Sequence, residues 1–238
     1  MAKVKLHNLN DAGNEYNIVE LDLSNSYTTV NISGGIINGD VYGGGYGFVQ
    51  DMPADVTMQG VGSVFGTANI NITGGNISGS VYGGSQGHSQ FYNKKNKYGQ
   101  TITHIAEMNG TVNLRISGTD AIWPTIGGNI YGGGAGVSTS GKQEYLRIAT
   151  TGNNDLGNEF KTDYSSSINV IIDLPKSHPF TGNIYGGGQM GRVDGSTKVI
   201  INDGIIKGDI FGGGKGEIGH PDKAKVTGNT NVIVVDKK

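Results

Sequence analysis

The sequence contains no cysteine, which removes disulfide bonds, thiolate metal sites and cysteine nucleophiles from consideration. Proline is rare, with 5 residues in 238, and glycine does not recur at every third position, so a collagen helix is excluded. Charged residues make up only 16% of the chain, and the net charge is −2. Because this charge offers no broad attraction to phosphate groups, we expect no nucleic-acid partner.

Long hydrophobic runs are also missing from the chain. No apolar stretch approaches the roughly 18 residues that cross a membrane, and the first ten residues lack the apolar segment of a signal peptide. Hydrophobic residues amount to 35%, which leaves little volume for one thick core, whereas glycine is abundant, with 43 residues. A repeat array reconciles these features, because each narrow coil buries its apolar strip against its neighbours.

One short box recurs five times, with the form aliphatic, aromatic, Gly, Gly, and then Gly or Ser. The boxes occupy 41–45, 81–85, 130–134, 184–188 and 210–214. A strand of alternating apolar residues precedes each box, and a sixth such strand lies at 232–234. Between strand and box, Gly34-Gly35, Gly74-Gly75 and Asp203-Gly204 predict tight corners with positive φ.

Side-chain parity predicts which residues face the interior, since positions i, i+2 and i+4 of a strand share one side. These positions read aliphatic, glycine, aliphatic in repeats such as Ile37, Gly39 and Val41, with Phe180 replacing the first aliphatic once. The residues of opposite parity are polar and are Asp40, Ser80, Asn129, Asn183 and Asp209. We expect the first set inside and the second in solvent, because a one-residue slip would bury polar groups.

The repeats predict an all-β fold, a single parallel β-solenoid of about five coils with three short strands per coil. The third strand is expected soon after the box, at 47–49, 136–137, 191–193 and 216–218. Spacing between equivalent strands varies, and the extra residues lie at 48–66, 86–109 and 138–166. Insertions at one place in a repeat project from one side of a solenoid.

The single domain is expected to span 1–238. Residues 28–235 hold the repeats, and residues 1–27 are an expected N-terminal cap that contains a strand at 16–23. We also expect the chain to be part of a longer repeat protein, with further coils of the parent chain as neighbours.

With its Val-Tyr-Gly-Gly-Gly boxes, the chain resembles the glycine-rich parallel β-helix repeat proteins of bacterial cell surfaces, in particular those of gut bacteria. The resemblance covers residues 28–235 apart from the long insertions. It implies an exported protein at the cell surface or outside the cell, with an adhesin-like or structural role. It supplies no catalytic residues to carry over.

Two groups of residues are candidates for ligand binding. The box aromatics form a predicted ladder on which sugar rings can stack; alternatively, the rings stack on one another beneath the segments that follow the boxes. The ladder consists of Tyr42, Tyr82, Tyr131, Tyr185 and Phe211. The second group lies in an insertion and suits an anionic glycan or polymer, although a solvated hairpin tip has the same composition. It consists of Phe91, Tyr92, Lys94, Lys95, Lys97 and Tyr98.

No catalytic, cofactor or metal site is predicted. Asp40 and Asp209 share a repeat position but are too far apart for paired-carboxylate catalysis, and no calcium-binding repeat is present. The histidines lack zinc-ligand spacing and are expected on the surface; they are His7, His88, His104, His178 and His220. We therefore expect a non-enzymatic surface or fibre module that presents loops to a glycan or another surface protein. The alternatives are a carbohydrate-active β-helix enzyme, such as a polysaccharide lyase or hydrolase, and a phage fibre protein.

Overall fold

The structure of the chain is a computed structural model that describes residues 3–9, 15–22, 27–47, 62, 64–87, 104–106, 108–136, 147–148, 151–152, 160–162, 166–218 and 223–235. These residues form β-strands, turns and bends, and none of them lies in a helix. Within the described ranges there is accordingly no helix that could cross a membrane. The chain is all-β, as predicted.

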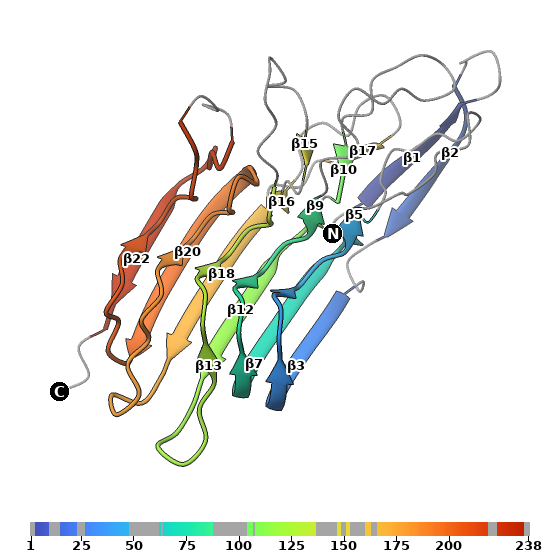
Figure 1. Ribbon diagram of the computed structural model, residues 1–238. Coiled ribbons are helices and arrows are strands. Elements are labelled where there is room, and N and C mark those ends of the chain that lie inside the picture. Colours follow the sequence, from blue (N-terminus) through green and yellow to red (C-terminus); the bar gives the residue numbers. More distant parts are fainter. Residues whose placement is uncertain are drawn as a thin grey trace.

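One strand from each repeat stacks beside its equivalents in parallel, in sequence order, and we call this array the main stack (Figure 1). Its members are β3 (Tyr27–Ile37), β7 (Thr67–Ile77), β12 (Val112–Ser117), β18 (Ser166–Asp173), β20 (Val193–Asp203) and β22 (Thr230–Val234). We number the repeats 1 to 6 after these strands. Equivalent residues pair in register, as Val30 with Ile70 and Val199 with Val232 show. The parallel pairing of the repeats is therefore confirmed.

The boxes form a second parallel array, the box stack. It consists of β4 (Val41–Tyr42), β8 (Val81–Tyr82), β14 (Ile130–Tyr131), β19 (Ile184–Tyr185) and β21 (Ile210–Phe211). A third parallel array joins β6 (Val64–Phe65), β11 (Met108–Asn109), β16 (Thr151–Gly152) and the start of β20. Side chains from the three arrays, such as Ile70, Val81 and Met108, share one hydrophobic core. This arrangement is consistent with the predicted solenoid.

Shorter strands complete the described structure. β5 (Tyr46–Gly47) pairs with β9 (Gln86–Gly87), and β13 (Thr125–Ile126) pairs with the end of β7. β10 (His104–Ile105) pairs with β15 (Arg147–Ile148). A separate antiparallel sheet contains β1 (Lys3–Leu9), β2 (Glu15–Asp22) and β17 (Phe160–Thr162).

Side-chain parity around the boxes is as predicted. Ile77 and Val81 are fully buried, and the intervening Gly79 has no room for a side chain, since a Cβ there would lie 2.6 Å from the carbonyl oxygen of Gly39. On the opposite side, polar side chains link neighbouring repeats. The Ser80 N–H donates to Asp40 Oδ1 (2.7 Å), and the Asn129 N–H donates to Ser80 Oγ (3.0 Å). The same ladder continues through Asn183 and Asp209.

The predicted position of the third strand is corrected in part by the structure. In repeat 5 the proposed strand at 191–193 is confirmed at Val193, which pairs with Thr151 of the third array. Gly47 lies in β5, whereas the described residues 136, 191–192 and 216–218 lie outside any strand, and residues 48–49 and 137 lie outside the described residues.

In repeat 4 the third strand is β16, which lies within the insertion and pairs with Met108. In repeats 2 and 3 the third strand comes after the insertion, directly before the main strand, where Met108 pairs with Val64. A left-handed residue, Gly62 (φ 65°) or Ala106 (φ 53°), stands two positions earlier and turns the chain toward the core.

The glycine corners are confirmed, because Gly35, Gly75 and Gly204 have φ values of 86°, 90° and 121°. The N-terminal strand predicted at 16–23 corresponds to β2, but β2 pairs with β1 and does not extend the main stack. No described residue pairs with the outer edge of β3. The capping role of residues 1–27 therefore stays a prediction.

Candidate functional site

The box aromatics form a continuous stack of rings. Adjacent ring centroids lie 4.8–4.9 Å apart with interplanar angles of 6–11°, from Tyr42 through Tyr82, Tyr131 and Tyr185 to Phe211. This spacing matches the separation of hydrogen-bonded strands, so strand pairing itself places ring on ring. Each of the three central rings has an aromatic neighbour on both faces.

Segments that follow the boxes cover these rings. Tyr82, Tyr131 and Tyr185 are buried and form a cluster with Ala135, and the Tyr82 hydroxyl donates to Gln189 Oε1. This geometry matches the alternative in which the rings stack on one another under the neighbouring chain. Sugar stacking on the ladder stays a prediction, and the ring face best placed for it belongs to Phe211, whose side chain is 42% exposed.

The buried phenols are held in their neutral form. Burial raises the pKa of Tyr82 to about 12, and the negative charge of Asp40 acts in the same direction. Burial, together with the adjacent Asp40 carboxylate, also raises the pKa of Tyr42. Burial raises the pKa of Tyr131. The hydroxyl groups of these three tyrosines therefore keep their protons and their hydrogen bonds at neutral pH.

The second predicted group, residues 91–98, lies outside the described residues, but the strands that flank the insertions are described. On the departing side β5 pairs with β9, and Gln86 bridges to Ala135. On the returning side β11 pairs with both β6 and β16, and β16 lies within the third insertion. The three insertions therefore leave and rejoin the stacks at adjacent repeats, on one edge.

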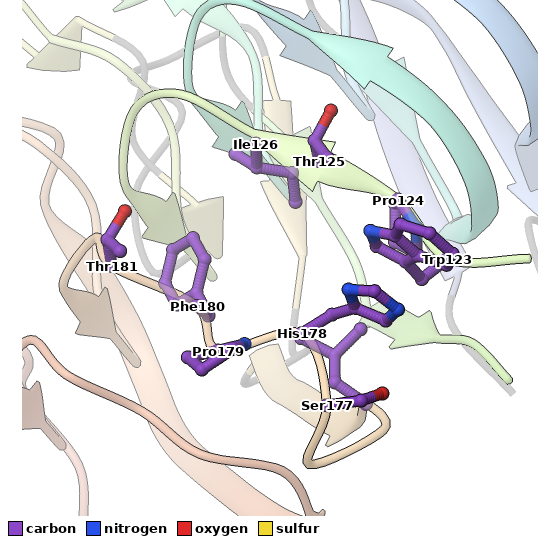
Figure 2. Close-up of a pocket in the computed structure, with 10 residues that line it drawn as sticks. Trp123, Pro124, Thr125, Ile126, Ser177, His178, Pro179, Phe180 and Thr181 are labelled. Atoms are coloured by element: carbon purple, nitrogen blue, oxygen red, sulfur yellow. The ribbon is translucent and has the colours of Figure 1, made fainter. Parts of the chain in front are cut away.

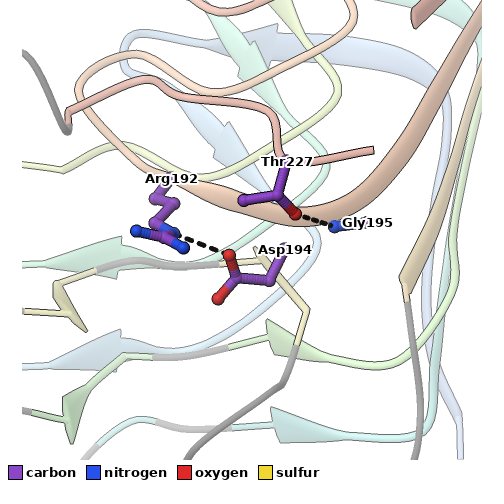
Figure 3. Close-up of polar contacts among 4 residues, drawn as sticks. All are labelled: Arg192, Asp194, Gly195 and Thr227. Carbon is purple, nitrogen blue, oxygen red and sulfur yellow. Dashed lines mark hydrogen bonds and ion pairs between the residues drawn. The ribbon is translucent and has the colours of Figure 1, made fainter. Parts of the chain in front are cut away.

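A buried ion pair stands at the start of β20 (Figure 3). Arg192 Nε lies 2.6 Å from Asp194 Oδ1, and the Asp194 side chain is fully buried. The neighbouring Gly195 N–H donates to Thr227 Oγ1 at 3.1 Å, which joins this turn to the next repeat. Because solvent does not reach the carboxylate, we assign the pair a structural role and not a catalytic one.

The structure also reveals a cleft that the sequence did not predict, at the corners of repeats 3 and 4. A corner spans six residues in repeat 2 (72–77), eleven in repeat 3 (116–126) and nine in repeat 4 (172–180). The two enlarged corners are neighbours in the stack. Residues of these two corners line what we call the corner cleft (Figure 2).

The corner cleft exists because the two repeats separate locally. Upstream, the Gly118 N–H still bonds to the carbonyl oxygen of Asp173 (3.1 Å). Farther on, Thr125–Ile126 pairs only with repeat 2, and Phe180 bridges to Ile206 of repeat 5. None of the described hydrogen bonds joins Thr125–Ile126 to Phe180 or its neighbours, so the sheet is open between them.

The lining of the corner cleft combines an apolar floor with a polar rim. Its volume is about 320 Å³. The floor is formed by the buried Ile126, Leu174 and Phe180. The walls and rim are Trp123, Pro124, Thr125, Ser177, His178, Pro179 and Thr181.

Trp123 and His178 form one end of the cleft. Their rings are stacked, with centroids 3.3 Å apart and an interplanar angle of 7°. Figure 2 shows this pair at one end and Ile126 and Phe180 on facing segments farther in. His178, predicted at the surface, is partly exposed and lines the cleft, and the sequence assigned no role to Trp123.

The described residues contain no group of three or more His, Cys, Asp and Glu side chains that could hold a metal ion. Comparison of the chain with protein-family models, curated proteins and solved structures gives no match.

Proposed function

We propose that the chain is a non-enzymatic surface or fibre module, adhesin-like, in which the three parallel arrays close into a β-solenoid that presents loops for recognition. The observation that carries the proposal is the pairing of β5 with β9 and of β11 with β6 and β16. This pairing sets the ends of three long insertions side by side. Insertions anchored side by side on one edge can contact one ligand together, which suits a glycan or another surface protein.

Rigidity of the scaffold supports this proposal, because loops held by a stiff framework lose less entropy when they bind. Backbone pairing is reinforced by side-chain ladders on the exposed face of the main stack. The Asn113 Nδ2 donates to Asn69 Oδ1 and the Asn169 Nδ2 donates to Asn113 Oδ1, each at 3.1 Å. The resemblance to glycine-rich repeat proteins of bacterial surfaces supports an extracellular or cell-surface location.

The second insertion is the part of this edge with the clearest chemistry for a ligand. Its residues Phe91–Tyr98 combine three aromatic rings with three lysines, which favours an anionic glycan. The test is to replace residues 90–99 with a Gly-Ser linker of equal length, which leaves β9 intact. We expect binding of sulfated or uronic-acid glycans on an array to be lost while the far-ultraviolet circular dichroism of the β-structure is kept.

A matched control replaces residues 138–146 of the third insertion in the same way. If the 90–99 replacement binds as well as the unaltered chain, the second insertion is not the recognition loop. Product release from a polysaccharide panel, abolished by one carboxylate substitution, would show that the chain is a carbohydrate-active enzyme instead.

A further inference from the structure

We propose that the corner cleft is a second ligand site, separate from the insertions, and that it binds one neutral pyranose ring of a glycan. The corners follow the C-terminal ends of the main strands, whereas the insertions precede the N-terminal ends of those strands. β18 is eight residues long, so roughly 25 Å separate the two edges. The site therefore does not depend on the insertions.

The shape of the cleft fits a sugar ring. A volume of about 320 Å³ is at the small end of the range for ligand pockets. The floor of Ile126, Leu174 and Phe180 offers an apolar surface for the C–H groups of a pyranose. Trp123 adds an aromatic wall, and aromatic rings with apolar floors suit the less polar faces of sugars.

Open backbone groups supply hydrogen-bond partners inside the cleft. The Gly127 N–H donates to the carbonyl oxygen of Ile77 in repeat 2. Because backbone groups of successive strand residues point to opposite sides, the N–H and C=O of Ile126 point toward repeat 4. Both backbone groups of Phe180 bond to repeat 5, which turns the Thr181 N–H toward repeat 3. Backbone groups at such depth need partners, and the hydroxyl groups of a sugar can both donate and accept.

Polar side chains at the rim extend this set of partners. The hydroxyl groups of Thr125, Ser177 and Thr181 lie around the cleft. The Thr125 hydroxyl donates to Asn76 Oδ1 at 3.0 Å and keeps its capacity to accept a hydrogen bond. The Ser177 hydroxyl donates to Asp120 Oδ1, which holds the rim of repeat 4 against that of repeat 3.

The charge of the lining favours a neutral ligand. No aspartate, glutamate, lysine or arginine is among the residues that line the cleft. The nearby Lys176 pairs with Asp203, with 3.7 Å between Nζ and Oδ1. A sulfated or uronic-acid sugar would bring a charge into this apolar cleft without a paired cation, which is costly.

The same backbone groups argue against an apolar side chain of a protein partner as the occupant. Such a side chain would cover the Ile126 and Thr181 backbone groups without pairing them, and burial of an unpaired polar group is unfavourable. A sugar ring can pack its C–H groups on the apolar floor and pair its hydroxyl groups with the Ile126 and Thr181 backbone groups. It is therefore the occupant that the lining of the cleft favours.

The chain contains one tryptophan, Trp123, so intrinsic tryptophan fluorescence reports directly on the cleft. The full chain is titrated with the methyl glycosides of glucose, galactose, mannose and N-acetylglucosamine, with their short oligosaccharides, and with glucuronic acid as the charged comparison. We expect a saturable change in intensity or emission maximum with at least one neutral sugar and none with glucuronic acid.

Variants are then compared by isothermal titration calorimetry, which does not require tryptophan. Trp123→Ala is expected to weaken binding of that sugar by at least about tenfold, and Trp123→Phe to restore part of it. The matched control is Ile122→Ala, because Ile122 is 61% exposed, adjacent in sequence and not part of the lining. We expect this control to bind within about twofold of the unaltered chain.

The outcomes separate this site from the insertion-bearing edge. Neutral-sugar binding that is lost in Trp123→Ala but kept when residues 90–99 are replaced supports the corner cleft. Binding that persists in Trp123→Ala and is lost in the loop replacement overturns the cleft proposal and leaves the proposed function standing. A fluorescence response only to proline-rich or aromatic peptides, or to no sugar in the panel, also overturns it.

Discussion

The second glycine of the box provides the sharpest test of the stacked architecture, because the same substitution meets different surroundings in different repeats. A Cβ on Gly133 would lie 2.7 Å from the Gly188 nitrogen and 2.9 Å from its Cα, both in the next repeat. On Gly213, the equivalent glycine of repeat 5, a Cβ would have no described atom within 4 Å. Neither glycine has a left-handed φ, so an alanine is tolerated by the backbone itself.

Gly133→Ala should therefore destabilise the fold, while Gly213→Ala should not. Contact at 2.7 Å forces the repeats apart where the Gly133 N–H bonds to the Gly187 carbonyl oxygen (3.1 Å). Overpacking of this kind costs about 1–3 kcal/mol, and weakening one hydrogen bond adds roughly 1 kcal/mol. We expect a loss of about 2–4 kcal/mol for Gly133→Ala and a change of at most about 1 kcal/mol, in either direction, for Gly213→Ala.

The assay is urea unfolding followed by far-ultraviolet circular dichroism, with the midpoint and the slope compared between variants. Gly187→Ala serves as a replicate, since its Cβ would lie 2.7 Å from the Gly214 nitrogen. Equal midpoints for Gly133→Ala and Gly213→Ala would refute the reasoning, because box glycines would then not be in contact with the next repeat.

Three further predictions follow from the same structure. Val81→Asp places a charge at a fully buried position, so we expect no cooperative unfolding transition for it; a normal melting curve would contradict the core assignment. Because the pKa of Tyr82 is raised to about 12 in the folded state, against about 10 when unfolded, the folded state retains its proton longer. The preference of the folded state for protonated Tyr82 stabilises the protein by at most about 2.7 kcal/mol, the equivalent of two pKa units. This stabilisation is complete below pH 10 and is lost as the pH rises from 10 to 12. Melting temperatures and absorbance at 295 nm across that interval check this, and a flat melting temperature would count against it. Arg192→Ala removes its ion pair with the buried Asp194 carboxylate, so the free energy of unfolding should fall by about 2–3 kcal/mol in urea titrations; an unchanged value would show that the pair contributes no net stability.

The repeat itself was predictable from sequence because strand parity and glycine positions carry strong physical constraints. The inward position of Val81 and the positive φ of Gly35 follow from local rules, and both are confirmed. The aromatic spacing was also predictable, since in-register parallel strands place equivalent side chains one strand apart. The residue that covers Tyr82 could not be predicted, because Gln189 lies more than one hundred residues later in the chain.

The third strand and the corner cleft show where local rules fail. A Gly-x-aliphatic pattern after the box predicts a strand, and in repeat 5 its aliphatic residue, Val193, does take the core position. In the repeats with an insertion, the core position goes to residues such as Met108, after or within the insertion. The cleft had a visible signal, because corners 116–126 and 172–180 are longer than 72–77. That signal was hidden by the larger insertions nearby, and sequence alone does not indicate that two enlarged corners keep the sheet from closing.

The polar ladder from Asp40 to Asp209 has a consequence for how such a chain can change. At every rung a side-chain oxygen accepts the N–H of the following rung, and serine, asparagine and aspartate all perform this task. Any short side chain with an acceptor oxygen meets this requirement. Duplication of a whole repeat therefore creates a new repeat whose polar contacts already match those of its two neighbours. The number of repeats can therefore increase by duplication. Substitutions among serine, asparagine and aspartate at this position leave the stacking of the repeats unchanged.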